Sequence, residues 1–216
     1  MNIILFGPPG AGKGTQAIKI VKNFNLYTVS TGDLLREEIK NNTNLGNKIK
    51  SMMDKGLLIS DNIINDLITK ILSEKKFYNR LIFDGYPRNL EQAINLDSLI
   101  KKYKQKISCA LSLNVDKESI IKRILGRQTC ANCGLIFNEY FYPASNKNHS
   151  CDPKFLNKRS DDNKKIIINR FETYLNKTLP ILDFYKEQNL LHQINGMAKI
   201  DQIFDEICGI IASLET

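Results

Sequence analysis

The chain has 216 residues, of which 42% are hydrophobic and 25% are charged, and its net charge is +8. These values fit one globular unit with a proper core, and no run reaches the roughly 20 apolar residues of a membrane span. A basic protein can bind polyanions, but the lysines from Lys101 to Lys106 resemble a solvated helix end. We therefore expect small phosphorylated ligands, with no nucleic acid or membrane partner.

Predicted strands and helices alternate along the chain. In chain order the expected elements are strand 2–6, helix 13–23, strand 27–29, helices 32–42, 45–55 and 61–73, strand 80–83, helix 89–102, strand 109–115, helix 117–126, strand 191–194 and helix 199–214. Residues 161–188 are predicted to be helical, with a break or kink at Pro180. Residues 128–158 lack a helical period and predict an inserted loop-rich or small β module. The alternation predicts an α/β fold with a parallel sheet covered on both faces. Because residues 3–6 have the pattern of a strand and not of a leader peptide, we expect a cytoplasmic protein.

A glycine-rich segment from Gly7 to Thr15 follows the first predicted strand. Its spacing fits G-x-x-x-x-G-K, in which glycines let several backbone N–H groups converge on phosphate oxygens at a helix N-terminus. Lys13 can reach the β- and γ-phosphates. Gly14 stands where Ser or Thr is usual, with Thr15 one residue later. The segment therefore predicts a nucleoside triphosphate site.

Several ordered motifs resemble those of the adenylate kinase family over essentially the whole chain. They are Gly12-Lys13-Gly14-Thr15, Ser30 to Arg36, Phe83 to Arg88 with Gln92, Arg123 to Arg127, and Arg159 to Asp162 with Arg170. The resemblance implies a P-loop three-layer sandwich with a central parallel five-stranded sheet, and the reaction ATP + AMP ⇌ 2 ADP. It also implies a monomer and three regions: a core (1–29, 60–126 and 161–216), an AMP-binding region (30–59) and a lid (127–160).

The resemblance assigns roles to individual residues, and the chemistry agrees, since phosphoryl transfer needs positioning and positive charge and no nucleophile. The catalytic set is Lys13, Asp84, Arg88, Arg123, Arg159 and Arg170, with Asp84 meeting the Mg²⁺ shell through water. The ATP set is Gly10, Ala11, Gly12, Lys13, Gly14, Thr15, Arg123, Arg127, Ile136, Phe137 and Ala198. The AMP set is Thr31, Arg36, Leu57, Leu58, Ile59, Gly85, Tyr86, Pro87, Arg88, Gln92, Arg159 and Arg170. The expected small-molecule partners are ATP, AMP and ADP.

Three cysteines cluster in the predicted lid. Cys130 and Cys133 form a C-x-x-C knuckle of the kind that holds tetrahedral Zn²⁺, and Cys151 offers a third thiolate. In the family the fourth ligand usually stands three residues after the third, where this chain has Lys154, which cannot serve. Asp152 or His149 is the expected substitute. The zinc would be structural, and the alternative is a lid that packs without metal.

Two other functions remain open at this point. A kinase of the same fold for another nucleoside monophosphate would share most of these motifs. A zinc-ribbon protein that binds nucleic acid would explain the charge and the C-x-x-C knuckle, but not the glycine loop or the Asp84–Arg88 motif.

Overall fold

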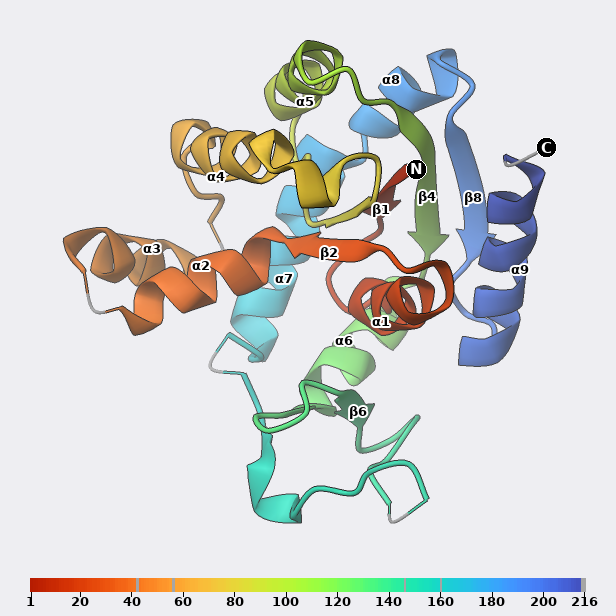
Figure 1. Ribbon diagram of the computed structural model, residues 1–216. Coiled ribbons are helices and arrows are strands. Elements are labelled where there is room, and N and C mark those ends of the chain that lie inside the picture. Colours follow the sequence, from red (N-terminus) through yellow and green to blue (C-terminus); the bar gives the residue numbers. More distant parts are fainter. Residues whose placement is uncertain (42, 56, 146, 160, 215–216) are drawn as a thin grey trace.

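The computed structural model describes residues 1–41, 43–55, 57–145, 147–159 and 161–214. Its main sheet has five parallel strands in the order β2-β3-β1-β4-β8 (Figure 1). Their bounds are β1 Asn2–Phe6, β2 Tyr27–Ser30, β3 Leu81–Asp84, β4 Ile107–Asn114 and β8 Leu191–Asn195. All five residues of β1 are buried, as expected for a central strand covered on both faces. The predicted parallel five-stranded sheet is therefore confirmed.

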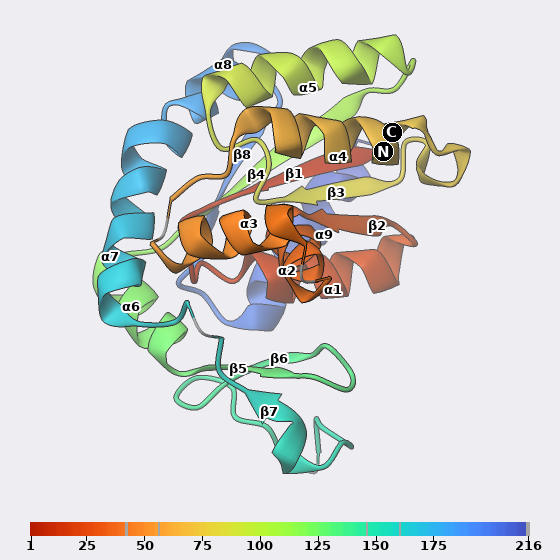
Figure 2. The same cartoon turned by 90° about the vertical axis from the view of Figure 1, so that its left-hand side faces the viewer.

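Helices cover the two faces of this sheet in separate layers (Figure 2). Helices α1 (Lys13–Phe24) and α9 (Ile200–Ser213) pack on one face, where Ile20 and Ile207 are fully buried. Helices α4 (Asp61–Ser73), α5 (Leu90–Lys102) and α8 (Ile181–Glu187) pack on the other, around Ile68 and Leu96. The result is the three-layer sandwich that the sequence motifs predict.

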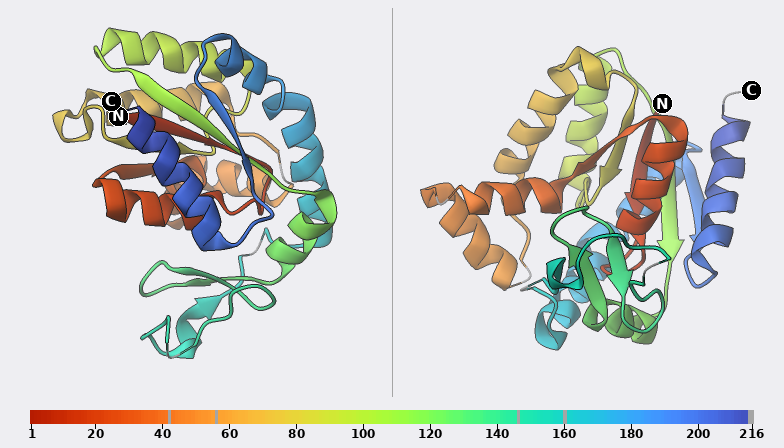
Figure 3. Two further views of the ribbon diagram at one scale, coloured as in Figure 1. Left: turned by 90° about the vertical axis from the view of Figure 1, so that its right-hand side faces the viewer. Right: turned by 60° about the horizontal axis from the view of Figure 1, so that its bottom comes forward.

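The remaining elements lie near the carboxyl ends of the strands. Helices α2 (Thr31–Lys40) and α3 (Asn44–Asp54) follow β2 and pack against each other. Helices α6 (Lys117–Leu125) and α7 (Lys164–Thr173) carry a small antiparallel sheet, which projects away from the layers in Figures 2 and 3. Its strands are β5 (Arg127–Cys130), β6 (Ile136–Asn138) and β7 (Leu156–Asn157), in the order β6-β5-β7. Of the two alternatives for this insertion, the small β module is correct.

The predicted helix over 161–188 differs from the structure. Helix α7 begins only at Lys164, because the Asn163 side chain caps it by accepting the Ile166 N–H. The helix then widens into the π-helical turn η3 (Tyr174–Thr178), where Leu179 N–H donates to the Tyr174 carbonyl five residues earlier. Pro180 has no N–H to continue the ladder, and α8 begins after it, so the predicted break is confirmed.

Other predicted boundaries agree to within two residues. Helix α2 ends at Lys40, and Asn42, where the predicted helix ends, lies outside the described residues, as does Ser160 of the last arginine motif. Short 3₁₀ turns add η1 (Lys75–Phe77) and η2 (Pro153–Phe155). In the described part of the chain no helix is both long and apolar enough to cross a membrane.

Candidate active site

The glycine loop connects β1 directly to α1. Gly10 and Gly12 have φ angles of 79° and 96°, in the left-handed region that favours glycine, and Gly12 is the N-cap of α1. A Cβ on Gly10 would lie 2.7 Å from the Ile124 side chain, so the loop also approaches α6 too closely for a larger residue. The loop thus directs the N-terminus of α1 toward the space above the carboxyl ends of the strands.

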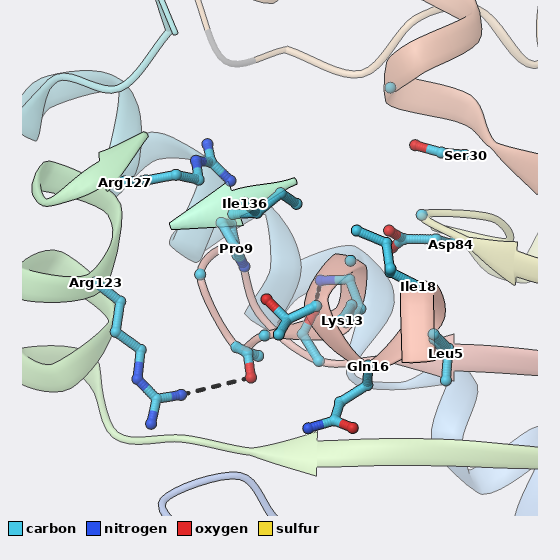
Figure 4. A pocket seen from close by; sticks show the side chains of 18 of the residues that line it. Leu5, Pro9, Lys13, Gln16, Ile18, Ser30, Asp84, Arg123, Arg127 and Ile136 are labelled. Atoms are coloured by element: carbon cyan, nitrogen blue, oxygen red, sulfur yellow. Dashed lines mark hydrogen bonds between the residues drawn. The ribbon is translucent and has the colours of Figure 1, made fainter. Parts of the chain in front are cut away.

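Lys13 stands at the first turn of α1 and folds back over the loop. Its Nζ donates to the carbonyl of Gly7 at 2.7 Å and to that of Pro8 at 3.1 Å. Burial lowers the pKa of Lys13 to about 8, an effect that the Asp84 carboxylate opposes and nearby arginines reinforce. In Figure 4, Lys13 lies between Arg123 and Arg127 on one side and Asp84 on the other.

A cavity of about 800 Å³ opens over this loop, and a smaller one of about 60 Å³ lies beside it under α2. The first volume is in the range of small-molecule ligand sites. The two cavities share lining residues, including Arg36, Arg88 and Arg170. The predicted ATP residues all line the large cavity, and the predicted AMP residues line one or both cavities except for Tyr86.

The exception, Tyr86, belongs to the core. Only 1% of it is exposed, and its single hydroxyl hydrogen has two acceptors within reach, Asn65 Oδ1 at 3.0 Å and the Gln92 carbonyl at 3.3 Å. Its contribution is to hold the segment between β3 and α5 in place, so nothing in the described structure gives its side chain access to a nucleotide. Gln92 itself is 2% exposed and lines the small cavity.

Arginines from distant segments converge on the large cavity. Arg36 comes from α2, Arg88 follows β3, Arg123 lies in the last turn of α6, Arg127 begins β5, Arg159 follows β7 and Arg170 lies on α7. Burial, reinforced by neighbouring guanidinium groups, lowers the pKa of Arg88 and of Arg159 to about 10 each. Both side chains therefore stay charged at neutral pH, at the cost of mutual repulsion that a bound phosphate would relieve.

Aspartates are paired with several of these arginines. Arg127 is held by Asp162 through two hydrogen bonds, one of them from Nε at 2.9 Å, and Arg170 Nη1 donates to Asp161 at 2.6 Å. Burial alone would raise the pKa of Asp161, but Arg170 and the surrounding arginines hold it below its ordinary value. Both aspartates belong to the Arg159–Asp162 motif, which by itself predicts no role for them. Their position two and three residues after Arg159 is the signal that could have pointed to them.

Arg123 reaches around the outer side of the loop. Its Nη1 donates to the Ala11 carbonyl at 3.5 Å, the contact dashed in Figure 4, and its Nη2 donates to the Gly196 carbonyl at 2.9 Å. Its guanidinium carbon lies 6.0 Å from the centre of the Phe141 ring. Phe141 and Met197 line the cavity and were missed, because neither belongs to a motif and only the fold brings them to the loop.

Three cysteines in the segment between α6 and α7 lie together with a histidine. Ligand atoms of Cys130, Cys133, His149 and Cys151 all lie within 4.8 Å of one another. His149 is buried beneath the Phe137 ring, 4.8 Å from its centre, and its Nε2 has no hydrogen-bond partner among the described residues. Burial would raise the pKa of Cys130, but the N–H of Cys133, which donates to its Sγ at 3.5 Å, contributes to lowering that pKa to about 6.

Asp152, the other expected fourth ligand, is not part of this cluster. Its carboxylate accepts the Lys154 N–H at 2.9 Å and pairs with Lys154 Nζ at 3.1 Å. Asp152 caps the turn η2 in this way, and the described residues bring only His149 to the three thiols. The sequence could not decide between His149 and Asp152 as the fourth ligand, because both lie within two residues of Cys151.

A strand–glycine loop–helix unit beneath converging arginines, with a second pocket beside it, defines a P-loop phosphotransferase. A family model described as adenylate kinase matches residues 5–190. The chain is 48% identical over 211 residues to an adenylate kinase of Pelagibacter ubique, covering 98% of this chain and 99% of that one. It is 40% identical to one of Methanothrix thermoacetophila, over 100% of both chains, and 41% identical to one of Fusobacterium nucleatum, over 98% of both. The chain therefore belongs to the adenylate kinase family and is a nucleoside monophosphate kinase.

Proposed function

We propose that this chain transfers the terminal phosphoryl group of Mg-ATP reversibly to AMP, giving two ADP, and so serves purine nucleotide and energy homeostasis. The observation that carries the proposal is the convergence of Lys13 and the motif arginines on one cavity that borders a second. Such a transfer spreads negative charge over the moving phosphoryl oxygens, so catalysis consists of positioning and electrostatic stabilisation. The acceptor is already an anionic phosphate, and the site needs no general base.

On the donor side, the loop from Gly10 to Thr15 offers its backbone N–H groups and the N-terminus of α1 to the phosphates of ATP. Lys13 would leave the carbonyls of Gly7 and Pro8 to contact the β- and γ-phosphates. We assign Arg123 and Arg127 to the ATP phosphates, with Ile136 and Phe137 along the nucleotide. Ala198, which lines the same cavity, would meet the adenine through its backbone.

On the acceptor side, Arg36 and Arg88 line both cavities and would hold the AMP phosphate. An arginine can bind two phosphate oxygens at once with its planar fork. Thr31 and Gln92 line the small cavity, together with Leu57, Leu58, Ile59 and Gly85, and would contact the base. Arg159 and Arg170 would bridge donor and acceptor, since Arg170 borders both cavities and Arg159 the larger one.

Adenylate kinases use Mg²⁺ with ATP, and Asp84 is the residue that fits this ion. Its carboxylate ends β3 within the cavity and lies 3.8 Å from the place a Cβ on Gly14 would occupy. The missing side chain at Gly14 thus leaves room between the loop and Asp84. The ion, when bound, would neutralise part of the triphosphate charge, and Asp84 would orient its water shell.

The division into three regions stays a proposal. We assign residues 30–59 to AMP binding, 127–160 to a lid and the rest to the core. The lid carries Arg127 and Arg159, so its closure would deliver both arginines and exclude water from the phosphates. A monomeric state and a cytoplasmic location stay predictions.

We also propose a structural Zn²⁺ held by Cys130, Cys133, His149 and Cys151. The donor set fits a tetrahedral structural site, and the unpartnered buried Nε2 of His149 fits a missing ligand bond. The ion would supply cross-linking to a module too small to have a core of its own, and it has no role in phosphoryl transfer.

A coupled assay of the purified enzyme with Mg-ATP and AMP, GMP, UMP or CMP tests the proposed reaction. We expect the highest kcat/KM with AMP. A preference for another monophosphate would assign the chain to the related kinase with a different acceptor and would refute the proposal. An enzyme that phosphorylates none of these four monophosphates would contradict its assignment as a nucleoside monophosphate kinase.

A further inference from the structure

The amide of Gln92, the residue proposed to contact the AMP base, is held on two sides by groups that cannot exchange roles. Its Oε1 accepts the backbone N–H of Arg88 at 2.7 Å. Its Nε2 donates to Oδ1 of Asp61 at 2.5 Å. A backbone N–H can only donate and an ionised carboxylate can only accept, so chemistry alone fixes which end of the amide faces which partner.

Asp61 is itself anchored. It opens α4, and Asn89, the N-cap of α5, donates Nδ2 to both of its carboxylate oxygens at 3.2 and 3.1 Å. The Oδ1 of the same Asn89 accepts the N–H of Gln92 at 2.8 Å. The start of α4, the start of α5 and the Gln92 side chain therefore form one closed network of hydrogen bonds.

This network leaves a defined pair of groups for the base. A primary amide has two acceptor sites on oxygen and two donor hydrogens on nitrogen. Arg88 uses one of the acceptor sites of Gln92 and Asp61 uses one of its hydrogens. One acceptor site on Oε1 and one hydrogen on Nε2 remain, and the network fixes which of the two lies on the Arg88 side and which on the Asp61 side. Gln92 lines the small cavity where the base would lie.

The order of this pair separates 6-amino from 6-oxo purines. Adenine presents a donor at its 6-amino group beside an acceptor at N1, whereas hypoxanthine and guanine present an acceptor at O6 beside a donor at N1. The same amide could bind a 6-oxo purine only after a flip. The flip would place Oε1 against the Asp61 carboxylate and Nε2 against the Arg88 N–H, leaving buried polar groups unpaired.

We propose that Asp61 is a specificity-determining positioning residue, which locks the Gln92 amide in the orientation that accepts AMP and rejects 6-oxo purine monophosphates. Asp61 lines neither cavity, so it acts through Gln92 and does not touch the nucleotide itself. The inference rests on the proposed AMP specificity and adds the residue that would enforce it.

The test compares wild type with Asp61→Asn and Asp61→Ala, using AMP and IMP as acceptors at saturating Mg-ATP. IMP differs from AMP only in the groups that the amide reads. An asparagine can offer either oxygen or nitrogen to Gln92, and an alanine offers neither. Both variants therefore remove the Asp61 part of the penalty on the flip and leave only the Arg88 N–H to oppose it. We expect the ratio of kcat/KM for AMP to that for IMP to fall by at least about tenfold in both, with the KM for Mg-ATP within about twofold of wild type.

Asp66→Asn is the matched control, because Asp66 is an exposed aspartate on the same helix. It makes the same charge change and should leave the ratio unaltered. A merely structural role for Asp61 would lower the melting temperature and reduce kcat/KM for AMP and IMP equally, and an unchanged ratio would overturn the inference. A wild-type enzyme that does not prefer AMP over IMP would instead refute the proposed function.

Discussion

The lowered pKa of Lys13 predicts a specific pH dependence. Burial disfavours the charged form of the amine, and the pKa moves from 10.5 to about 8. The free enzyme therefore holds the cation below about pH 8 and loses it above. Only the protonated form can pair with the phosphates of ATP, so kcat/KM for Mg-ATP, which reports on the free enzyme, should fall as the pH rises through this value.

The size of the effect follows from the two pKa values. With a pKa of about 8, the protonated fraction of Lys13 falls from about 0.9 at pH 7 to about 0.1 at pH 9, a decrease of about tenfold. A lysine at its ordinary pKa of 10.5 would still be about 97% protonated at pH 9. The two cases are easily separated by measurement, because the triphosphate is fully ionised throughout this range.

The assay is kcat/KM for Mg-ATP at saturating AMP, in half-unit steps over that range, with kcat measured in parallel. Bound phosphates favour the protonated amine, so kcat should stay nearly constant where kcat/KM falls. Lys13→Arg is the control, since a guanidinium keeps its charge and its lower kcat/KM should be independent of pH. A change of less than about twofold in the wild-type kcat/KM would refute the reasoning.

The other predictions concern single side chains. Lys13→Met should lower kcat by about two to three orders of magnitude and leave the circular dichroism spectrum unchanged, and near-normal turnover would contradict the role of the loop. Arg88→Met should lower kcat/KM for AMP at least about a hundredfold while the KM for Mg-ATP changes by less than about threefold, and equal losses for both nucleotides would count against its place at the AMP phosphate. Metal analysis of protein prepared without chelators should find one zinc per chain, and His149→Ala should lower both the zinc content and the melting temperature, whereas Asp152→Ala should alter neither; absence of zinc from the wild type would exclude the metal site.

The sequence predicts what is encoded locally. The segment from Phe6 to Lys13 contains the end of β1, the loop and the start of α1, so its structure follows from residues adjacent in the chain. The parallel sheet is also predictable, since short, largely apolar strands such as β1 alternate with amphipathic helices. Pro180 predicts a break, because the lack of an N–H is a property of one residue.

The sequence does not predict contacts that only the fold creates. Asp61 and Gln92 are 31 residues apart, and their hydrogen bond depends on how α4 and α5 pack. Arg127 and Asp162 meet 35 residues apart, across the lid insertion. The choice of His149 over Asp152 depends on a turn in which Asp152 prefers the Lys154 N–H. In each case several partners are chemically acceptable, and packing decides between them.

The aspartate partners indicate how so much positive charge is tolerated before any nucleotide binds. The side chain of Asp162 is only 2% exposed and that of Arg127 16% exposed, so removing either partner would leave a charge with little access to water. Bound phosphate would compete with Asp161 and Asp162 for Arg170 and Arg127. The free energy gained on binding would be the difference between the new arginine–phosphate pairs and the arginine–aspartate pairs that they replace. In the proposed reaction the aspartates would compensate the arginines in the free enzyme, and the phosphates would take their place on binding. Under the proposed assignment, the occupancy of the phosphate site and the position of the lid would depend on the same side chains, at the junction of α7 and the lid.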